Sequence, residues 1–264
     1  MYLGIDIGSS SSKVALINDR KEIAAISIIN RGTGTDAPAR ALADAMEKAG
    51  VTEEDIDYTV ATGYGRITYE GADKQITEIT CHAKGVSYLD PGARTIIDIG
   101  GQDAKVIKLS PKGHVENFVM NEKCAAGTGR FLEVMARVLG CTLEELSPLA
   151  DQSTKDVAIS SVCTVFAESE VISRLAAGET LPDVARGAHI SVAHRVTGLC
   201  NRVGCEPKVV MTGGVALNSN MVDALSKELG CMVEVVPNCQ AAGAVGAALF
   251  AYEAGTKAAA KEKK

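Results

Sequence analysis

Short apolar runs that end in glycine or polar residues alternate along this chain with longer stretches in which apolar residues recur every three or four positions. The short runs are typical of strands, and the longer stretches are typical of helices that bury one face. The longer stretches predict one helix over 125–139 and another from just after Cys163 to near Gly178. Strands and helices in alternation predict an α/β protein.

Two of the strand-rich stretches repeat one another. Segments 4–17 (GIDIGSSSSKVALI) and 96–109 (IIDIGGQDAKVIKL) align without gaps, and both place Ile-Asp-Ile-Gly and Lys-Val at matching positions. In each copy a strand leads through a glycine-rich turn into a second strand, and a polar turn then leads into a third. Because one offset relates the two copies, we expect a β-meander that the chain forms twice, as an internal repeat of domain size.

The glycine-rich turns of this repeat have the chemistry of phosphate-binding loops. Gly8 and Gly100 allow backbone angles at which successive N–H groups point into the turn. Asp6 and Asp98 each end an apolar strand, and two facing carboxylates require a cation such as Mg²⁺ held mostly through waters. The residues expected to bind phosphate are Ser9, Ser10, Ser11, Ser12 and Lys13 in the first loop and Gly100, Gly101 and Gln102 in the second.

Two later segments complete a candidate nucleotide site. A strand over 209–211 runs through a Thr-Gly-Gly turn into a helix, and Gly213 and Gly214 would let the backbone lie flat against a planar ligand. Asn218 lies near the start of that helix, and Gln240 begins a last helix over about 240–252 whose small residues favour close packing. Neither GxxxxGK[ST] nor GxGxxG occurs, so a P-loop protein and a dinucleotide-binding fold are unsupported.

Composition narrows the class of protein further. Apolar residues make up 46% of the 264 residues and charged residues 23%, as in ordinary globular proteins. The net charge of −6 argues against a nucleic-acid partner, and no long uncharged apolar run predicts a membrane span. The chain starts directly with a strand-like run, so we expect no leader peptide and a cytoplasmic location. Eight cysteines without any CxxC are expected to be reduced thiols or metal ligands.

Taken in order, these elements resemble the actin, sugar-kinase and heat-shock-chaperone ATPase superfamily. The motifs ATGYGR, DKQITEITCHAKG, NEKCAAGTGRFLEVMA, SSVCTVFAESEVIS and MTGGVALN narrow the resemblance to the ATP-dependent activators of 2-hydroxyacyl-CoA dehydratases, to which the ATPase subunits of benzoyl-CoA reductases are similar. The resemblance covers essentially the whole chain. It implies duplicated actin-like (ribonuclease-H-like) ATPase domains with a cleft for ATP or ADP between them.

The resemblance also implies domain boundaries and a cofactor. A first ATPase domain would span 1–94 and be completed by a C-terminal helix over 240–256, a second would span 95–239, and 257–264 would be a solvated tail. A homodimer would share one [4Fe–4S] cluster, ligated in each chain by Cys124 and Cys163. The residues agree, because two thiolates from each of two chains supply four, and a helix beginning after each cysteine favours an anion there.

The implied activity is an oxygen-sensitive ATPase that passes single electrons at very low potential to a 2-hydroxyacyl-CoA dehydratase. Ferredoxin or flavodoxin would supply the electron, with no nucleic acid and no membrane involved. Asp6, Asp98 and Asp103 are the expected catalytic residues. Asp103 and Glu168 both remain candidates for positioning the attacking water, with Gln102 on the phosphates.

Several alternatives remain open at this point. A small-molecule kinase of the same superfamily would use the same loops with Asp103 as the base, and a non-catalytic scaffold of the actin type is a further reading. The six cysteines other than Cys124 and Cys163 are expected to be buried small hydrophobes. In particular, Cys200 and Cys205 are expected to face different sides of a helix, and Cys81 next to His82 is not expected to act as a nucleophile.

Overall fold

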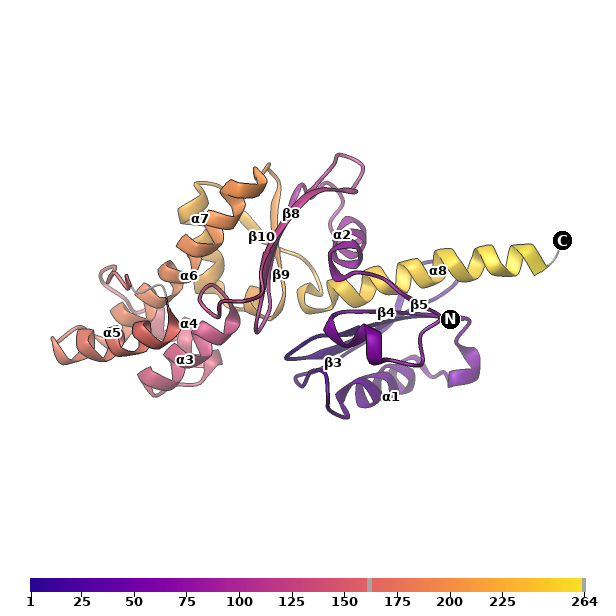
Figure 1. The fold of residues 1–264 in the computed structure, drawn as a ribbon, viewed down its shortest axis with the longest axis horizontal. Helices are drawn as coiled ribbons and strands as arrows, with labels where there is room; N and C mark the ends of the chain where they lie inside the picture. The colour runs from indigo at the N-terminus through magenta and orange to yellow at the C-terminus, as the bar shows by residue number, and fades with distance from the viewer. Residues whose placement is uncertain (161–162, 263–264) are drawn as a thin grey trace. The chain divides into compact units, whose positions relative to one another are not determined.

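The computed structural model describes residues 1–160 and 163–262 and divides into two compact units. Unit 1 comprises Met1–Ala93, Leu109–Val115 and the C-terminal segment from Val236, and unit 2 comprises Arg94–Lys108 and Glu116–Val235. Figure 1 labels the helices and strands of both units. Ser161 and Val162, within one of the recognised motifs, and the last two residues of the expected tail lie outside the described residues.

Unit 1 is a five-stranded sheet in the order β3-β2-β1-β4-β5 with helices on both faces. The three strands at the start of the chain are antiparallel neighbours, and β4 and β5 continue the sheet in parallel. The elements are β1 (Tyr2–Ile7), β2 (Ser12–Ile17), β3 (Ile23–Ile29), α1 (Ala37–Ala49), η1 (Glu53–Asp55), β4 (Tyr58–Thr62), η2 (Tyr64–Thr68), β5 (Lys74–Gln75), α2 (Glu78–Leu89), η4 (Cys239–Ala241) and α8 (Ala242–Glu262).

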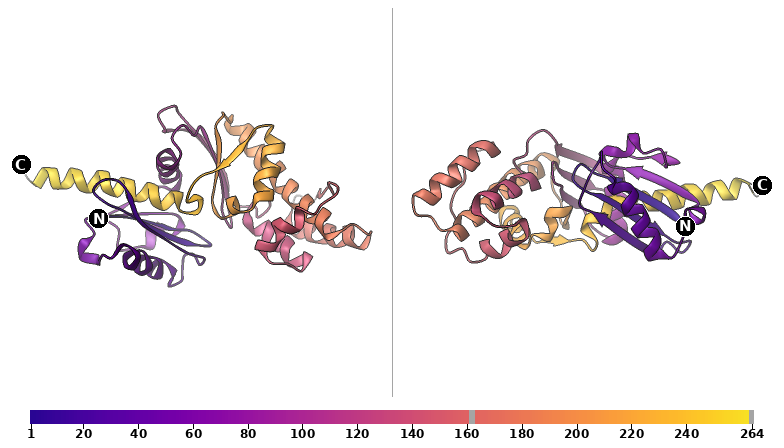
Figure 2. Two further views of the ribbon diagram at one scale, coloured as in Figure 1. Left: turned by 180° about the vertical axis from the view of Figure 1, so that it is seen from behind. Right: turned by 90° about the horizontal axis from the view of Figure 1, so that it is seen from below.

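Successive side chains along a strand point to opposite faces of the sheet, and in unit 1 different helices cover the two faces. Leu3, Ile5 and Ile7 of β1 pack with α1, whereas Ala15 and Ile17 of β2 pack with α8. Both faces of the sheet are therefore buried, which explains why its central strands are almost wholly apolar. Figures 1 and 2 agree that α8 runs along this sheet beside α2.

Unit 2 repeats the same sheet, in the order β10-β9-β6-β7-β8. Again the first two strands form an antiparallel hairpin, and β9 then joins β6, and β10 joins β9, in parallel. The elements are β6 (Thr95–Ile99), β7 (Ala104–Leu109), β8 (Val115–Asn121), α3 (Gly129–Leu139), α4 (Leu143–Ala150), α5 (Thr164–Ala176), α6 (Leu181–Val203), β9 (Val209–Thr212), η3 (Gly214–Leu217), α7 (Ser219–Leu229) and β10 (Val233–Val235). The α/β class and the duplicated meander predicted from the sequence are confirmed.

Glycine and alanine allow α8 to approach its neighbours at backbone contact. A Cβ on Gly4 of β1 would overlap the backbone of Ala244, and a Cβ on Gly85 of α2 would overlap the carbonyl oxygen of Ala242. Ala244, like the other alanines on this face of α8, is fully buried. The prediction that small residues near the chain end permit close helix packing is therefore confirmed.

Two predicted helix boundaries are wrong. The helix expected over 125–139 begins only at Gly129, because Gly127 adopts a left-handed φ of 90° and the preceding residues form turns. The last helix starts at Ala242, after a 3₁₀ turn, and continues to Glu262, beyond both expected ends at residues 252 and 256. The helix expected after Cys163 is confirmed as α5, with Cys163 as its N-cap residue.

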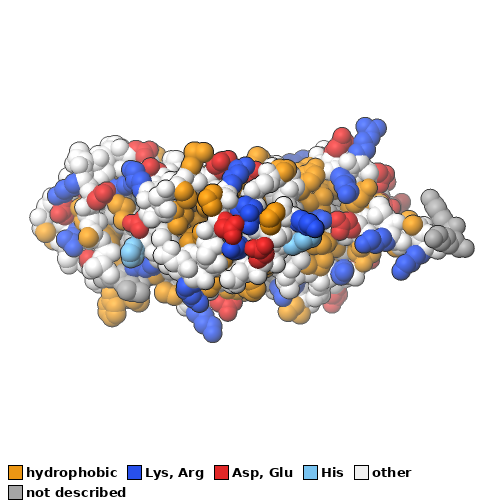
Figure 3. Space-filling view, turned by 90° about the horizontal axis from the view of Figure 1, so that it is seen from above, with side chains coloured by type: hydrophobic (Ala, Val, Ile, Leu, Met, Phe, Trp, Pro, Cys, Tyr) orange, Lys and Arg blue, Asp and Glu red, His pale blue; other side chains and the backbone are white. Residues whose placement is uncertain are grey.

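The surface is mixed in charge, and no described helix meets the length and apolarity needed to cross a bilayer. On the face drawn in Figure 3, Lys and Arg side chains are interspersed with Asp and Glu side chains. This mixing accords with the modest net charge of −6.

The backbone contact between α2 and α8 gives a stability prediction. Gly85→Ala should lower the free energy of unfolding by roughly 1–3 kcal/mol or more, because the new methyl group must force the two helix backbones apart. Gly198→Ala is the matched control, since Gly198 lies in α6 and, apart from the backbone of its own helix and its chain neighbours, nothing lies within 4 Å of the new Cβ. That control should be neutral or stabilise by up to about 1 kcal/mol. Equal losses in urea unfolding of both variants would contradict the packing account.

Candidate functional site

The loop between β6 and β7 encloses a buried group of three charges. Asp98, Asp103 and Lys105 are each at most 4% exposed. Lys105 Nζ lies 3.1 Å from Asp98 Oδ2 and 2.9 Å from Asp103 Oδ2. One ammonium group therefore serves two carboxylates, which leaves this loop with an excess of buried negative charge.

The loop between β1 and β2 has a simpler charge arrangement. Lys13 Nζ lies 3.1 Å from Asp6 Oδ2, and Ser11 occupies the position that corresponds to Asp103 in the repeat. Asp6 is 2% exposed, and its Oδ1 has no hydrogen-bond partner among the described residues. The Cα atoms of Gly63 and Gly243 approach this carboxylate so closely that a Cβ on either would touch it. An unpartnered buried carboxylate oxygen requires a cation or water to compensate its desolvation.

The two loops have the same backbone turn. Gly8 N donates to Ser11 O at 3.0 Å, and Gly100 N donates to Asp103 O at 2.9 Å. Ser12 is the exception among the expected phosphate ligands, because it is fully buried and its hydroxyl donates to the Arg31 carbonyl at 3.0 Å. The other expected ligands of these loops, Ser9, Ser10, Ser11, Lys13, Gly100, Gly101 and Gln102, are exposed or half-buried.

Thr212 is a site residue that the sequence analysis did not select. Its hydroxyl donates to Asp98 Oδ1 at 2.8 Å, so both oxygens of Asp98 have protein partners. The feature that identifies Thr212 as a site residue is the parallel pairing of β6 with β9, which places Thr212 opposite Asp98. Sequence alone did not reveal that pairing, because the two strands are more than a hundred residues apart.

The Gly213-Gly214 turn follows directly on Thr212. Gly213 has a φ of 86°, and a Cβ there would overlap the Ile99 carbonyl oxygen. Gly214 is exposed at the start of η3, as expected of a residue that a flat ligand could cover. Gln240, within η4 of unit 1, is half-buried.

The side-chain amide of Asn218 is engaged within the protein. Its oxygen accepts from Met221 N at 2.9 Å as the N-cap of α7, and its Nδ2 lies 2.9 Å from His189 Nε2. His189 Nδ1 lies 2.8 Å from the Ala185 carbonyl oxygen. The histidine is therefore a neutral imidazole that donates from Nδ1 and accepts at Nε2. Burial lowers its pKa to about 4.

Cys124 is an exposed thiol in the turn between β8 and α3. The side-chain amide of Asn121 holds that turn through three hydrogen bonds. Its Nδ2 donates to Cys124 O at 2.8 Å and to Ala126 O at 3.1 Å, and its Oδ1 accepts from Cys124 N at 3.2 Å. The side chain of Arg195 in α6 lies against Gly127 and over the ring of Phe131 at 5.4 Å. Burial lowers the Arg195 pKa, and attraction to Cys124 opposes that shift.

The second expected metal ligand, Cys163, is also exposed. It occupies the N-cap position of α5 without a side-chain capping hydrogen bond, and α5 packs against α3. Three apolar side chains of α5, Val165, Phe166 and Ile172, are more than half exposed.

The start of α3 is bonded directly to the loop between β6 and β7. Gly129 N donates to Gly100 O at 2.9 Å, and Arg130 N donates to Gly101 O at 2.8 Å. Gly129 itself allows this approach, since a Cβ there would lie 3.0 Å from the Gly100 oxygen. The loop of the buried carboxylates and the turn that carries Cys124 are therefore parts of one hydrogen-bonded assembly within unit 2.

The remaining cysteines differ from the expectation. Cys81, Cys200 and Cys239 are buried, but Cys141, Cys205 and Cys231 are only half-buried, so the expectation of six buried thiols is wrong for three of them. Burial raises the pKa of Cys81 to about 12, which leaves it protonated and without nucleophilic character beside His82.

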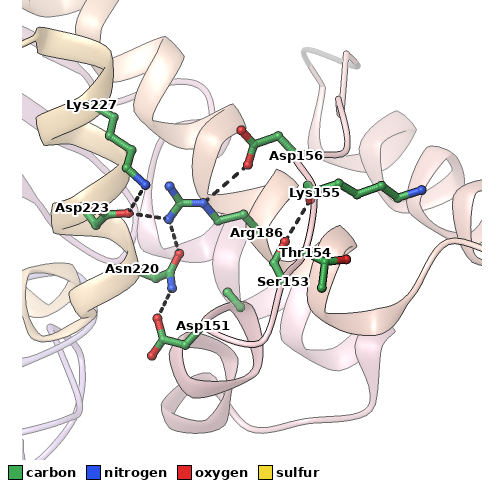
Figure 4. A pocket seen from close by; sticks show the side chains of 10 residues that line it. Asp151, Ser153, Thr154, Lys155, Asp156, Arg186, Asn220, Asp223 and Lys227 are labelled. Atoms are coloured by element: carbon green, nitrogen blue, oxygen red, sulfur yellow. Dashed lines mark hydrogen bonds and ion pairs between the residues drawn. The ribbon is translucent and has the colours of Figure 1, made fainter.

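A cavity of about 330 Å³ lies elsewhere in unit 2, and no expected site residue lines it. Arg186 crosses it and pairs with Asn220 at 2.5 Å and with Asp223 at 2.8 Å (Figure 4). Asn220 in turn donates to Asp151 at 2.5 Å. The polar side chains at the centre of the cavity pair with one another and connect α6 and α7 with the end of α4. These pairs stabilise the packing of the three helices, so we assign the cavity a structural role.

Comparison with known proteins gives concordant matches over the whole chain. The model of the BadF/BadG/BcrA/BcrD ATPase family matches residues 3–251. The activator of lactoyl-CoA dehydratase from Anaerotignum propionicum is 58% identical over 97% of this chain and 100% of its own length. The (R)-2-hydroxyglutaryl-CoA dehydratase activating ATPase of Acidaminococcus fermentans is 53% identical over 97% of this chain and 98% of its own.

A solved structure supports the same conclusion about the fold. The activator of the 2-hydroxyisocaproyl-CoA dehydratase from Clostridium difficile, with bound ADPNP, superposes with a TM-score of 0.95. It is 48% identical and covers 99% of this chain and 98% of its own. The fold class expected from the sequence, α/β with actin-like ATPase character, is confirmed.

Neutral His189 should make stability depend on pH. Its pKa lies near 4 in the folded chain and near 6.5 when exposed, so the unfolded chain binds the extra proton between these values. Stability should therefore fall as the pH drops from about 6.5 to 4, by up to about 3 kcal/mol. His189→Gln, which cannot titrate, should lose this component in urea unfolding followed across that range. Identical pH dependence in both proteins would contradict the assignment.

Removing each loop lysine should have unequal effects on stability. Lys105→Met leaves two buried carboxylates without their cation and should cost about 3–5 kcal/mol at neutral pH. Lys13→Met leaves one carboxylate, at a position where the lysine is 16% exposed, and should cost roughly 1.5–3 kcal/mol. Chemical unfolding of the two variants measures the difference. A larger loss for Lys13→Met would show that the charge arrangement is not the controlling factor.

Proposed function

The chain belongs to the BadF/BadG/BcrA/BcrD ATPase family, and from that premise we propose that it is an ATP-hydrolysing activator of a 2-hydroxyacyl-CoA dehydratase. In this proposal ATP hydrolysis drives single electrons at low potential onto the dehydratase. The names of two relatives more than half identical, one acting with lactoyl-CoA dehydratase and one with 2-hydroxyglutaryl-CoA dehydratase, support the class of partner.

The two loops would bind the phosphates of ATP. Exposed backbone and hydroxyl groups of Ser9, Ser10 and Ser11 would contact them from one loop, and Gly100, Gly101 and Gln102 from the other. Asp6 Oδ1, buried and unpartnered among the described residues, supports Mg²⁺ held through water. The ADPNP bound to the related activator supports nucleotide binding by this chain.

Of the two candidates for positioning the attacking water, we favour Asp103. It lies within the phosphate loop itself and is held in place by Lys105. Glu168 lies on α5 and pairs at 3.9 Å with Arg137 of α3, so it belongs to the helices near the thiols. Gly213, Gly214, Asn218 and Gln240 remain the proposed contacts for the adenosine part.

The donor set fits a [4Fe–4S] cluster shared by two copies of the chain. Such a cluster takes four thiolates and transfers one electron at a time at low potential. Cys124 and Cys163 are both exposed, so each chain offers two thiols at its surface. Exposed Val165, Phe166 and Ile172 on α5, the helix that follows Cys163, supply the apolar surface that a second copy would cover. Asn121 would hold the Cys124 turn in a fixed geometry before the thiols are engaged.

The observation that carries the proposal is the bonding of α3 to the phosphate loop. Because Gly129 and Arg130 donate to carbonyls of Gly100 and Gly101, a shift of that loop on ATP binding would move the start of α3. Cys124 precedes this start by only a few residues, and α3 packs on α5, which begins directly after Cys163. The free energy for this movement would come from the difference in ATP affinity between the loop position before the shift and the position after it.

The proposal also includes an electron donor, which would be ferredoxin or flavodoxin. The protein would be an oxygen-sensitive homodimer in the cytoplasm. The rival reading, a small-molecule kinase with Asp103 as base, gives the exposed Cys124 and Cys163 no role. The long motif run shared with dehydratase activators favours the activator.

Two substitutions separate the nucleotide site from the thiol site. Asp6→Asn should reduce ATP turnover by at least about 100-fold, because it removes the charge that faces the proposed Mg²⁺ and Lys13. It should leave the iron content unchanged, because Asp6 belongs to unit 1 and both thiols belong to unit 2. Cys124→Ala should lose the iron and acid-labile sulfide and keep ATP hydrolysis within a few-fold of the natural chain. Anaerobic purification followed by iron, sulfide and phosphate-release assays measures both effects.

Cys141→Ala is the matched control for the thiol substitution, since Cys141 is half-buried and outside the proposed site. It should keep both the iron and the ATPase activity. Full iron in Cys124→Ala would exclude Cys124 as a ligand, and undiminished turnover in Asp6→Asn would exclude the proposed nucleotide site.

A further inference from the structure

Arg195 is a half-buried cation on α6 that packs against the turn carrying Cys124. A Cβ placed on Gly127 would lie 3.4 Å from the Arg195 Cβ and 3.8 Å from its Cδ, so the stem of the arginine side chain lies against this turn. The guanidinium carbon lies 5.4 Å from the centre of the Phe131 ring in α3. The arginine therefore contacts both the Cys124 turn and the helix that follows it.

Hydrogen bonds fix the direction of this side chain. Arg195 Nη1 donates to the Ser191 carbonyl oxygen at 2.5 Å and also to the Ser191 hydroxyl. That hydroxyl in turn donates at 3.2 Å to the carbonyl oxygen of Ile159, four residues before Cys163. Both acceptors of Nη1 are neutral oxygens, so these two bonds orient the guanidinium without neutralising it. Arg195 thus lies against the turn of one proposed ligand and is bonded, through Ser191, to the segment that leads to the other.

The cations that flank Cys124 in the sequence are more exposed to water. Lys123 is exposed, and the side chain of Arg130 is 59% exposed and pairs with Glu133 at 2.9 Å. Water and salt screen exposed charges, whereas a half-buried charge acts through a lower effective dielectric constant. Attraction to Cys124 also opposes the lowering of the Arg195 pKa by burial. Arg195 is therefore the cation best placed to act on negative charge at Cys124.

We propose that Arg195 compensates the negative charge that gathers at Cys124, first on the thiolate and then on the iron–sulfur cluster. The part that concerns the cluster rests on the proposed function. The cluster gains one negative charge when it accepts an electron, so a cation held nearby stabilises its reduced form more than its oxidised form. Arg195 thereby raises the reduction potential and makes the cluster easier for the electron donor to reduce. This effect comes from the charge of the side chain and not from its packing.

The first test is a redox titration of the full, anaerobically purified protein, followed by the electron paramagnetic resonance signal of the reduced cluster. Arg195→Met keeps an unbranched apolar stem and removes the charge. It should lower the equilibrium constant for reduction roughly ten-fold, which is a shift of about 59 mV to more negative potential. Arg195→Lys keeps the charge and should restore most of that shift. Arg202→Met is the matched control, because Arg202 is exposed about two turns further along α6, and it should leave the potential unchanged.

A second test needs no iron. The full chain is freed of iron with a chelator, and Cys124 is alkylated in parallel by anionic iodoacetate and by neutral iodoacetamide. The tryptic peptide 124–130 contains no other cysteine and reports each rate. A cation beside the thiolate attracts the anionic reagent, so Arg195→Met should lower the ratio of the iodoacetate rate to the iodoacetamide rate roughly two- to five-fold. Arg202→Met should leave this ratio unchanged.

The two measurements distinguish the possible failures. An unchanged potential in iron-loaded Arg195→Met overturns the proposal for the cluster, and an unchanged rate ratio overturns it for the thiolate. Changes in Arg195→Lys as large as those in Arg195→Met would show an effect of packing and overturn both parts. A lowered rate ratio in a protein that never holds iron would support the charge at Cys124 and count against the proposed function alone.

Discussion

A buried carboxylate faced by a lysine across the first hairpin of each sheet is the constraint on which the structure depends. Asp6 is the register partner of Lys13, and Asp98 is the register partner of Lys105. A charge at the end of an apolar strand is costly unless it is paired, so each glycine turn must fold to bring its lysine back over the carboxylate. The turn that satisfies the charge also exposes backbone amides at the same edge of the sheet.

The repeat is not symmetric in charge, and the asymmetry has consequences. In unit 2 Asp103 adds a second carboxylate, and the Thr212 hydroxyl donates to Asp98 Oδ1. In unit 1 the corresponding oxygen of Asp6 has no hydrogen-bond partner among the described residues. Loop two is also the one whose carbonyls hold the start of α3. The second copy of the hairpin thus has the additional carboxylate and the bonds to α3, and the first copy has the carboxylate oxygen best placed for a hydrated cation.

Much of the fold could be predicted from sequence because its signals are local. Hydrophobic runs around a repeated Ile-Asp-Ile-Gly identify both meanders, and small residues in 241–248 identify the tightly packed last helix. The site was predicted less completely. Thr212 was missed because its partner Asp98 lies across a parallel pairing, and the burial of Ser12 follows from strand alternation that the run of four serines conceals.

The errors at the cysteines have a common physical cause. A single glycine with positive φ ends or delays a helix, as Gly127 does before α3 and Gly204 does after α6. Periodicity cannot locate such a turn to the residue, yet the turn at Gly204 places Cys205 beyond the end of the helix that carries Cys200. The cavity network around Arg186 was likewise invisible, since its members come from three helices that only tertiary packing brings together.

The central claim is that the phosphate loop is mechanically linked to thiols that are proposed to hold a shared iron–sulfur cluster. Its most direct test is the electron paramagnetic resonance spectrum of the reduced protein, recorded with and without a non-hydrolysable ATP analogue. The account predicts an iron–sulfur signal that changes when the analogue binds to the natural chain and stays unchanged when Asp6 is replaced by Asn. A protein without that signal, or a signal that the analogue does not alter, would contradict it.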